Sequence, residues 1–186
     1  MKQRTIILAS ASPRRRELLA ELRLPFEVVP ADIDERPWPN EAPASYALRN
    51  AGEKARAVFS KSGGTVIGAD TIVVCDGLIL EKPADTAHAR EMLKLLSGRW
   101  HEVITGLCVI SDDRESARAV RTEVRFKELS LFDIDLYIAN GEPMDKAGAY
   151  AIQGGAGEFV AEIKGSYSNV VGFPLDEVRE LLKSYQ

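Results

Sequence analysis

The chain has little of several residue types, and each shortage excludes a class of protein. Only two of its 186 residues are cysteines, and Cys75 and Cys108 stand at no spacing typical of a metal site. A disulfide framework and a cysteine-based zinc site are therefore excluded. Both cysteines fall in apolar, strand-like segments, which predicts reduced thiols in a core and favours a cytoplasmic protein.

Long hydrophobic runs and an excess of basic charge are also missing. The apolar or β-branched run at residues 5–9 ends at Ser10, too early for the core of a signal peptide, and no run approaches the length of a membrane span. With 24 Lys and Arg against 28 Asp and Glu, the formal net charge is −4. We therefore expect no nucleic-acid or membrane partner, and a polyanionic ligand would have to be held by local cations.

Histidine is also scarce, with two residues in the chain, and its scarcity bears on catalysis. The several serines suggest a serine hydrolase as one alternative, but the chain has no G-x-S-x-G elbow, and neither His88 nor His101 lies beside an evident nucleophile. What remains is an ordinary globular composition, 45% hydrophobic and 28% charged, without repeats. The length predicts one domain over residues 1–186, with room for two lobes.

The most informative stretch joins a short strand to a helix near the start of the chain. Residues 5–9 predict a buried strand, and Ser12 followed by Pro13 predicts a helix start, since serine caps helices and proline tolerates the first helical position. Ser10 and Ser12 add hydroxyl groups, and residues 14–16 add three arginines. Such a junction can bind a phosphate. A solvated basic first turn explains the same residues.

An acidic loop and an isolated lysine follow. The loop at residues 31–39 places Asp32, Asp34 and Glu35 within four positions, which fits a plain solvated loop or ligands for a divalent metal. The pattern at residues 44–59 predicts a helix, and Lys54 falls on its inward stripe among small residues. Lys54 then either points into a polar cleft or extends along the surface to water.

A single aspartate interrupts the most apolar segment of the chain. Residues 65–75 predict a strand, and Asp76-Gly77 predicts a hairpin turn into residues 78–80. Asp70 lies inside the strand, where propensity and desolvation both disfavour a carboxylate, so we interpret it as functional. After the hairpin, Lys82 precedes a proline and is therefore expected to be extended.

The rest of the chain predicts further elements of an α/β protein. We expect a helix capped by Asp85 and a helix that begins with a capping box at Ser130 and Asp133. We expect strands at residues 100–110 and 118–129 with a turn at 111–115, and a last helix at 175–182. Residues 145–157 are rich in glycine, typical of turns or of a segment passing under a ligand, and Gln153 there could read a base edge.

Taken in order, these motifs resemble the Maf family of nucleoside triphosphate pyrophosphatases. The matching segments are Ser10-Ala11-Ser12-Pro13-Arg14-Arg15, Glu53-Lys54-Ala55, Gly68-Ala69-Asp70-Thr71, Glu81-Lys82-Pro83, Leu96-Ser97-Gly98, Gly165-Ser166-Tyr167 and Gly172-Phe173-Pro174-Leu175. The resemblance implies an α/β fold like that of inosine triphosphatase, a long mixed sheet flanked by helices with a cleft between two lobes. Residues 145–154 resemble the branch that acts on dTTP and UTP. Asn50 departs from the pattern, which predicts a bulkier residue there; we expect this to affect only local helix packing.

The resemblance also implies roles for individual residues. They are Asp70, Glu35, Lys54 and Lys82 in catalysis, Ser10, Ser12 and Arg15 in phosphate binding, and Arg14, Thr71 and Gln153 in the choice of base. Asp70, with help from Glu35, would hold Mg²⁺ or Mn²⁺, and Lys54 and Lys82 would hold phosphates. The hypothesis for mechanism is a water activated at this metal that attacks the α-phosphorus in line and releases pyrophosphate.

The expected biology is that of a house-cleaning hydrolase of the nucleotide pool, a cytoplasmic homodimer by resemblance. Two alternatives stay open within the family. One is the same chemistry on a different base, 7-methyl-GTP. The other is a nucleotide-binding regulator of septum formation in which hydrolysis is incidental.

Overall fold

A computed structural model describes residues 5–185 of the chain. The strands are β1 (Ile6–Leu8), β2 (Phe26–Val28), β3 (Thr65–Cys75), β4 (Leu78–Leu80), β5 (Trp100–Ser111), β6 (Arg114–Phe126) and β7 (Val160–Lys164). The α-helices are α1 (Pro13–Ala20), α2 (Pro43–Ser62), α3 (Thr86–Leu96), α4 (Leu131–Ala139), α5 (Tyr167–Val171) and α6 (Leu175–Lys183). Three short 3-10 helices lie at Glu142–Asp145, Ala147–Ala149 and Gly155–Phe159.

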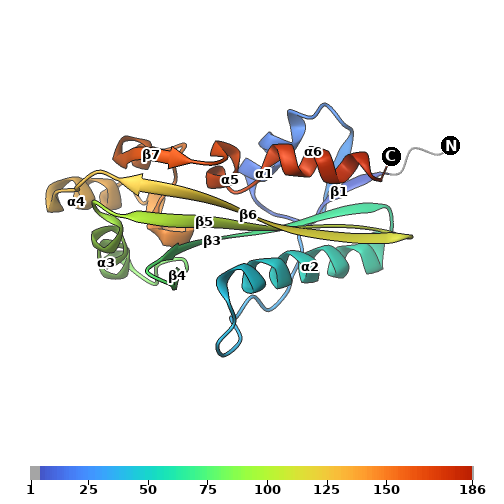
Figure 1. Ribbon diagram of the computed structural model, residues 1–186, viewed down its shortest axis with the longest axis horizontal. Coiled ribbons are helices and arrows are strands. Elements are labelled where there is room, and N and C mark those ends of the chain that lie inside the picture. The colour runs from blue at the N-terminus through green and yellow to red at the C-terminus, as the bar shows by residue number, and fades with distance from the viewer. Residues whose placement is uncertain (1–4, 186) are drawn as a thin grey trace. The chain divides into compact units, whose positions relative to one another are not determined.

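The strands form one mixed sheet. Their order is β2-β1-β3-β5-β6-β7, and β4 pairs with β3 off this path. β1 is parallel to β2 and to β3, whereas β4 is antiparallel to β3 and β7 is antiparallel to β6. The predicted long mixed sheet with flanking helices is confirmed (Figure 1). Among the helices of residues 5–185, none combines the length and apolar character that a bilayer span requires.

The predicted starts of three helices are confirmed, because each has the side chain that its first turn needs. Ser12, Asp85 and Ser130 cap α1, α3 and α4, and Ser130 forms a capping box with Asp133. The turn predicted at residues 111–115 is shorter than expected: β5 continues through Ser111 and β6 already begins at Arg114.

Within residues 5–185 the chain divides into two compact units. The first contains residues 5–71, 105–120 and 172–185, and the second contains residues 72–104 and 121–171. The chain enters each unit more than once, so neither unit is a continuous segment. One domain over residues 1–186 stays a prediction.

In the first unit, α2 packs closely on the sheet. Figure 1 shows α2 on one side of β1 and β3, with α1 and α6 on the opposite side. A Cβ on Gly68 would lie 2.1 Å from the carbonyl oxygen of Ala51, and one on Gly106 would lie 2.2 Å from that of Ala47. Only glycine fits at these positions, and α2 therefore approaches the strands closely enough for short side chains to meet.

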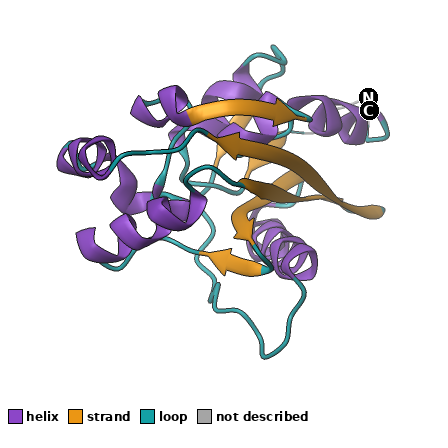
Figure 2. Ribbon diagram, turned by 60° about the vertical axis from the view of Figure 1, so that its left-hand side comes forward, coloured by secondary structure: helices purple, strands orange, loops and turns teal. Residues whose placement is uncertain are grey.

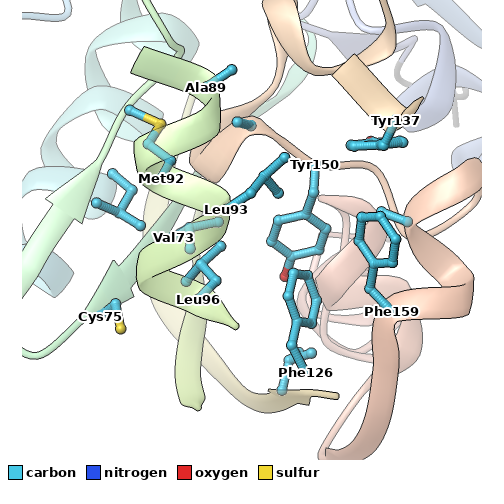
Figure 3. Packing of buried hydrophobic residues seen from close by; sticks show 14 of the residues in the cluster. Val73, Cys75, Ala89, Met92, Leu93, Leu96, Phe126, Tyr137, Tyr150 and Phe159 are labelled. Atoms are coloured by element: carbon cyan, nitrogen blue, oxygen red, sulfur yellow. The ribbon is translucent and has the colours of Figure 1, made fainter. Parts of the chain in front are cut away.

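In the second unit, aromatic rings and the apolar face of α3 form the core. Figure 3 shows Leu93 and Leu96 of α3 beside Phe126 and Tyr150. The rings of Phe126 and Tyr150 are 4.9 Å apart at an interplanar angle of 72°, an edge-to-face arrangement that aromatic pairs prefer. This core fixes the strands and turns of the second unit.

Both cysteines are buried with free thiols, as predicted, one in each unit. Burial raises the pKa of both thiols, that of Cys108 to about 12. They are therefore inert core residues near neutral pH.

Candidate active site

The β1–α1 junction in the first unit orders the hydroxyl groups that the sequence predicted. Ser12 caps α1, its Oγ accepting a hydrogen bond of 3.4 Å from the backbone N–H of Arg15. The Oγ of Ser10 accepts from the backbone N–H of Ser12 at 3.2 Å and from Nη1 of Arg15 at 3.3 Å. The two serines therefore hold the first turn of α1 and the side chain of Arg15 in one arrangement.

Most N–H groups of the Arg15 guanidinium donate hydrogen bonds within the protein. Its Nε donates to the carbonyl oxygen of Gly172 at 2.9 Å, Nη1 to that of Ala69 at 2.9 Å, and Nη2 to Oγ1 of Thr71 at 3.1 Å. With the bond to Ser10, four of the five N–H groups of the guanidinium are used. Burial lowers the pKa of Arg15, opposed by the nearby carboxylates of Asp70 and Glu35.

Thr71 is bound just as fully. Its Oγ1 accepts from Arg15 and donates to the carbonyl oxygen of Gly172 at 3.1 Å, and it lies 2.9 Å from Oγ1 of Thr105. One proton and two lone pairs are all that a hydroxyl offers, so this hydroxyl is saturated by the protein. Arg15 and Thr71 together join α1, the middle of β3 and the segment before α6.

The centre of the site is a lysine between two carboxylates. Nζ of Lys54 lies 2.7 Å from Oε2 of Glu35 and 2.7 Å from Oδ1 of Asp70. Lys54 and Asp70 are buried, whereas the side chain of Glu35 is 51% exposed. The structure buries Lys54 with its ammonium between two carboxylates, so the alternative in which the side chain extends along the surface to water is wrong. The predicted polar cleft stays a prediction. The cluster carries two negative charges against one positive charge.

The sequence explains why these groups meet. Gly68 and Asp70 are two residues apart in β3 and share the face toward α2. Because Gly68 lets α2 approach, Lys54 on the adjacent turn of that helix reaches Asp70. The strand that seemed too apolar for an aspartate therefore presents it to a helix that brings the counter-charge.

Sequence reasoning missed Asn50. We expected its departure from the family pattern to concern helix packing alone, and this was wrong. Asn50 is fully buried, its Nδ2 donates to Oδ2 of Asp70 at 3.1 Å, and its Oδ1 accepts from Nη1 of Arg49 at 3.2 Å. The signal that could have found it is spacing, because Asn50 and Lys54 are four residues apart and share one face of α2.

Of the acidic loop, only Glu35 is directed at this cluster. The loop covers residues 29–42 without regular structure, and it is the long teal loop that hangs lowest in Figure 2. Asp34 instead pairs with Arg36 in solvent, and the hydrogen bonds from Arg36 lower the pKa of Asp34 to about 2. The backbone oxygen of Glu35 accepts a 2.7 Å hydrogen bond from the hydroxyl of Tyr46 on α2.

Arg49 fastens the same loop to α2. Its guanidinium forms an ion pair of 2.7 Å with Glu41, donates to the carbonyl oxygen of Arg36 at 3.1 Å, and lies 4.3 Å from the ring centre of Trp38. The hydrogen bonds that Arg49 donates to Glu41 raise the pKa of Arg49 and lower the pKa of Glu41. Two side chains of α2, Tyr46 and Arg49, therefore hold the loop that carries Glu35. Arg49 directly precedes Asn50 in the helix.

The donor set fits a divalent cation in part. Across residues 5–185 no three His, Cys, Asp or Glu side chains gather as a ready metal site. Asp70 and Glu35 nevertheless converge on one ammonium group, so their hard oxygens already surround a cation. Two carboxylates with substrate phosphates are a typical way to hold Mg²⁺.

The remaining predicted residues are Arg14, in the β1–α1 junction, and Lys82 and Gln153, in the second unit. Arg14, in the first turn of α1, is partly buried and its Nε has no hydrogen-bond partner among the described residues. Lys82 and Gln153 belong to the second unit and are exposed. The turn after Gln153 is held by Glu142, whose Oε2 accepts from the backbone N–H of Gly155 at 3.1 Å.

Comparison with known proteins decides the family. A family model described as "Maf-like protein" matches residues 5–185. The chain belongs to this Maf-like family. The Maf-like chain is 53% identical over 186 residues to a protein of Citrifermentans bemidjiense named "dTTP/UTP pyrophosphatase", covering 98% of this chain and 96% of the relative. It is 56% identical over 176 residues to a protein of the same name from Thermococcus onnurineus, with 95% of each chain covered.

Solved structures confirm the fold expected of a Maf-like protein. The Ham1 protein of Staphylococcus aureus matches with a TM-score of 0.57 at 12% identity, over 98% of this chain and 100% of that chain. A HAM1 protein of Coxiella burnetii matches with a TM-score of 0.53 at 16% identity and the same coverage. At such low identity these matches concern the fold alone.

Proposed function

We propose that this Maf-like protein hydrolyses dTTP and UTP to the nucleoside monophosphate and pyrophosphate, in a house-cleaning role. The observation that carries the proposal is the cluster of Asp70, Lys54 and Glu35 next to the β1–α1 junction, in which Lys54 and Asp70 are buried. Arg15 links the two, since it donates to the carbonyl of Ala69 beside Asp70. Relatives named "dTTP/UTP pyrophosphatase" at 53% and 56% identity support the same choice of substrates.

The reaction assigns a distinct task to each group. A water oxygen bonds to the α-phosphorus while the bond from that phosphorus to the bridging oxygen breaks, and pyrophosphate leaves with the electron pair. The carboxylate of Asp70 orients this water and accepts its proton. The ammonium of Lys54 turns from the carboxylates to a phosphoryl oxygen, and Ser10 and Ser12 hold the helix start against the phosphates.

A divalent metal belongs to the proposal, with Asp70 and Glu35 as its protein ligands. When bound, Mg²⁺ or Mn²⁺ would neutralise phosphate charge and polarise the phosphoryl oxygen. Lys82 and Gln153 complete the proposal as a phosphate contact and a base contact, together with Arg14 and Thr71 in base selection. By family resemblance, the proposal includes a cytoplasmic location and a homodimer. Light scattering would measure the mass of the homodimer in solution.

The decisive test is the Asp70→Asn variant on a nucleotide panel. The wild type is expected to release pyrophosphate from dTTP and UTP, and the variant is expected to lose about 100-fold or more in kcat, because the amide cannot accept the proton. Asparagine keeps the shape of the side chain, and Lys54 keeps Glu35, so the fold should persist. Pyrophosphate release is measured with Mg²⁺, with Mn²⁺ and with chelator.

Asp34→Asn is the matched control, since Asp34 pairs with Arg36 in solvent, and it should keep the wild-type rate. A near-normal rate for Asp70→Asn would remove Asp70 from the mechanism. Turnover of 7-methyl-GTP in place of dTTP and UTP would move the proposal to that substrate. Tight binding of nucleotides without turnover would favour the regulator of septum formation instead.

A further inference from the structure

We propose that Asn50 is a positioning residue that fixes the orientation of the Asp70 carboxylate. This inference rests on the proposed function and adds to it a residue of this chain that departs from the family pattern. The side-chain amide of Asn50 bonds to Asp70 and to Arg49, and it acts on the site through Asp70.

The contact holds the second oxygen of the carboxylate. Lys54 donates to Oδ1 of Asp70 at 2.7 Å, and Asn50 donates to Oδ2 at 3.1 Å. Both donors come from the same face of α2, one helical turn apart. A carboxylate held at both oxygens from one rigid helix cannot rotate about its Cβ–Cγ bond without losing a hydrogen bond, and inside a protein that loss is costly.

The neighbours of Asn50 leave its amide only one orientation. A carboxylate can only accept hydrogen bonds, so the NH₂ group must face Asp70. A guanidinium can only donate, so the carbonyl oxygen must face Arg49, 3.2 Å from its Nη1. The two contacts agree on the same assignment, and a flipped amide would place like groups together on both sides.

Arg49 is in turn fixed by the acidic loop. Glu41 receives hydrogen bonds of 2.7 and 2.8 Å from Arg49, and the carbonyl oxygen of Arg36 receives another. A continuous chain of contacts therefore runs from the loop that carries Glu35, through Arg49 and Asn50, to Asp70. Each carboxylate of the cluster is set by a group on α2, and supporting groups of this kind typically change metal affinity or activity by about 10–100-fold when removed.

The experiment compares Asn50→Leu with the wild type on dTTP. Leucine has the same branched shape and the same number of side-chain heavy atoms, although it is bulkier, and it cannot donate, so Oδ2 of Asp70 loses its partner. We expect kcat to fall by about 10-fold or more while KM changes by less than about 3-fold, because Asn50 orients the reacting carboxylate and does not hold substrate. Asn50→Ala removes the amide without adding bulk and gives the same test if the leucine variant does not fold.

Val58→Ala is the matched control on the same helix, because Val58 is a buried side chain of the hydrophobic core that α2 forms with the sheet. It should lower the melting temperature and leave kcat per folded protein unchanged. A kcat within about 2-fold of wild type in both Asn50 variants, or a change confined to KM, overturns the inference. A wild-type protein that hydrolyses no nucleotide overturns the proposed function itself, which separates the two failures.

Discussion

Lys54 shows how a single residue lowers the free-energy cost of burying charged groups in a site. A lone buried ammonium costs several kcal/mol, and so does a lone buried carboxylate. Here the attraction between Lys54 and Asp70 offsets part of the desolvation cost of each, and the half-exposed Glu35 adds a second partner at 2.7 Å. Because the ammonium is shared, either carboxylate can release it to a phosphate and the lysine still has one partner.

His101 is the residue whose burial gives a measurable pH effect. It is buried in β5, with Nε2 2.8 Å from the hydroxyl of Tyr150 and its ring edge-on to Phe126. Burial lowers the pKa of His101 from 6.5 to about 4 and raises that of Tyr150, so both are neutral near pH 7. An unfolded chain therefore binds one more proton than the folded chain between these two values.

We expect the free energy of unfolding to contain the full His101 contribution above pH 6.5 and to lose about 3 kcal/mol of it as the pH falls to 4. Urea unfolding of the wild type and of His101→Gln between pH 4 and 7 measures this. The variant should have a flatter pH dependence over that interval. His88→Gln, at an exposed position of α3, is the control and should keep the wild-type slope; equal slopes for all three proteins would contradict the prediction.

At the scale of elements, the spacing between α2 and β3 controls the site. Gly68→Ala would place a Cβ 2.1 Å from the carbonyl oxygen of Ala51, and backbone cannot give way as a side chain can. We expect a loss of stability of about 1–3 kcal/mol or more, together with a fall in kcat, since α2 must move away from Asp70. Thermal unfolding and pyrophosphate release measure the two effects.

Gly77→Ala is the control for this prediction. Gly77 sits in the β3–β4 turn at φ 78°, with open space around its Cβ position, so the variant is strained without a clash. It should cost about 1 kcal/mol in stability and leave kcat unchanged. If Gly68→Ala keeps full activity, the close approach of α2 is not what places Lys54 and Asn50.

The elements that the sequence predicted well are those with local signals. Ser12, Asp85 and Ser130 mark helix starts through their own hydrogen bonds, and Asp76 with Gly77 marks the hairpin. By contrast, β7 and α5 had no such signal: β7 is half exposed and exists through its pairing with β6, and α5 has five residues. The early start of β6 was missed for the same reason, because residues 114–118 show no apolar alternation.

For the whole molecule, ligand binding should raise the free energy of unfolding and the melting temperature. A ligand that binds only the folded chain stabilises it by about 2.7 kcal/mol at 100 times its Kd. For a chain of this length that corresponds to a rise in Tm of roughly 5–10 °C. We expect this rise with a non-hydrolysable dTTP analogue and Mg²⁺, measured by calorimetry. The matching ATP analogue should give a much smaller rise, and equal rises for both would contradict a preference for dTTP.

The sequence predicts which residues form the candidate site better than it predicts the hydrogen bonds between them. The chain order of motifs identified Asp70, Lys54 and Glu35, and the structure brings them together. That Arg15 is almost fully engaged by two backbone carbonyls and two side-chain hydroxyls, and that Asn50 holds Asp70, depends on segments far apart in sequence. The division of residues 5–185 into two discontinuous units likewise depends on contacts between segments far apart in sequence, which no local pattern records.

The close seating of α2 also limits how the gene can change in length. Between Pro43 and Lys54 the helix keeps Asn50 and Lys54 in phase with one strand face. Adding or deleting one codon there would turn every later side chain by about 100°, moving Lys54 out of register with Asp70 while the helix itself survived. Residues 29–34 are irregular and fix no helical rotation, so insertions there should be tolerated. Natural differences in length should therefore occur before α2 and not within its first three turns.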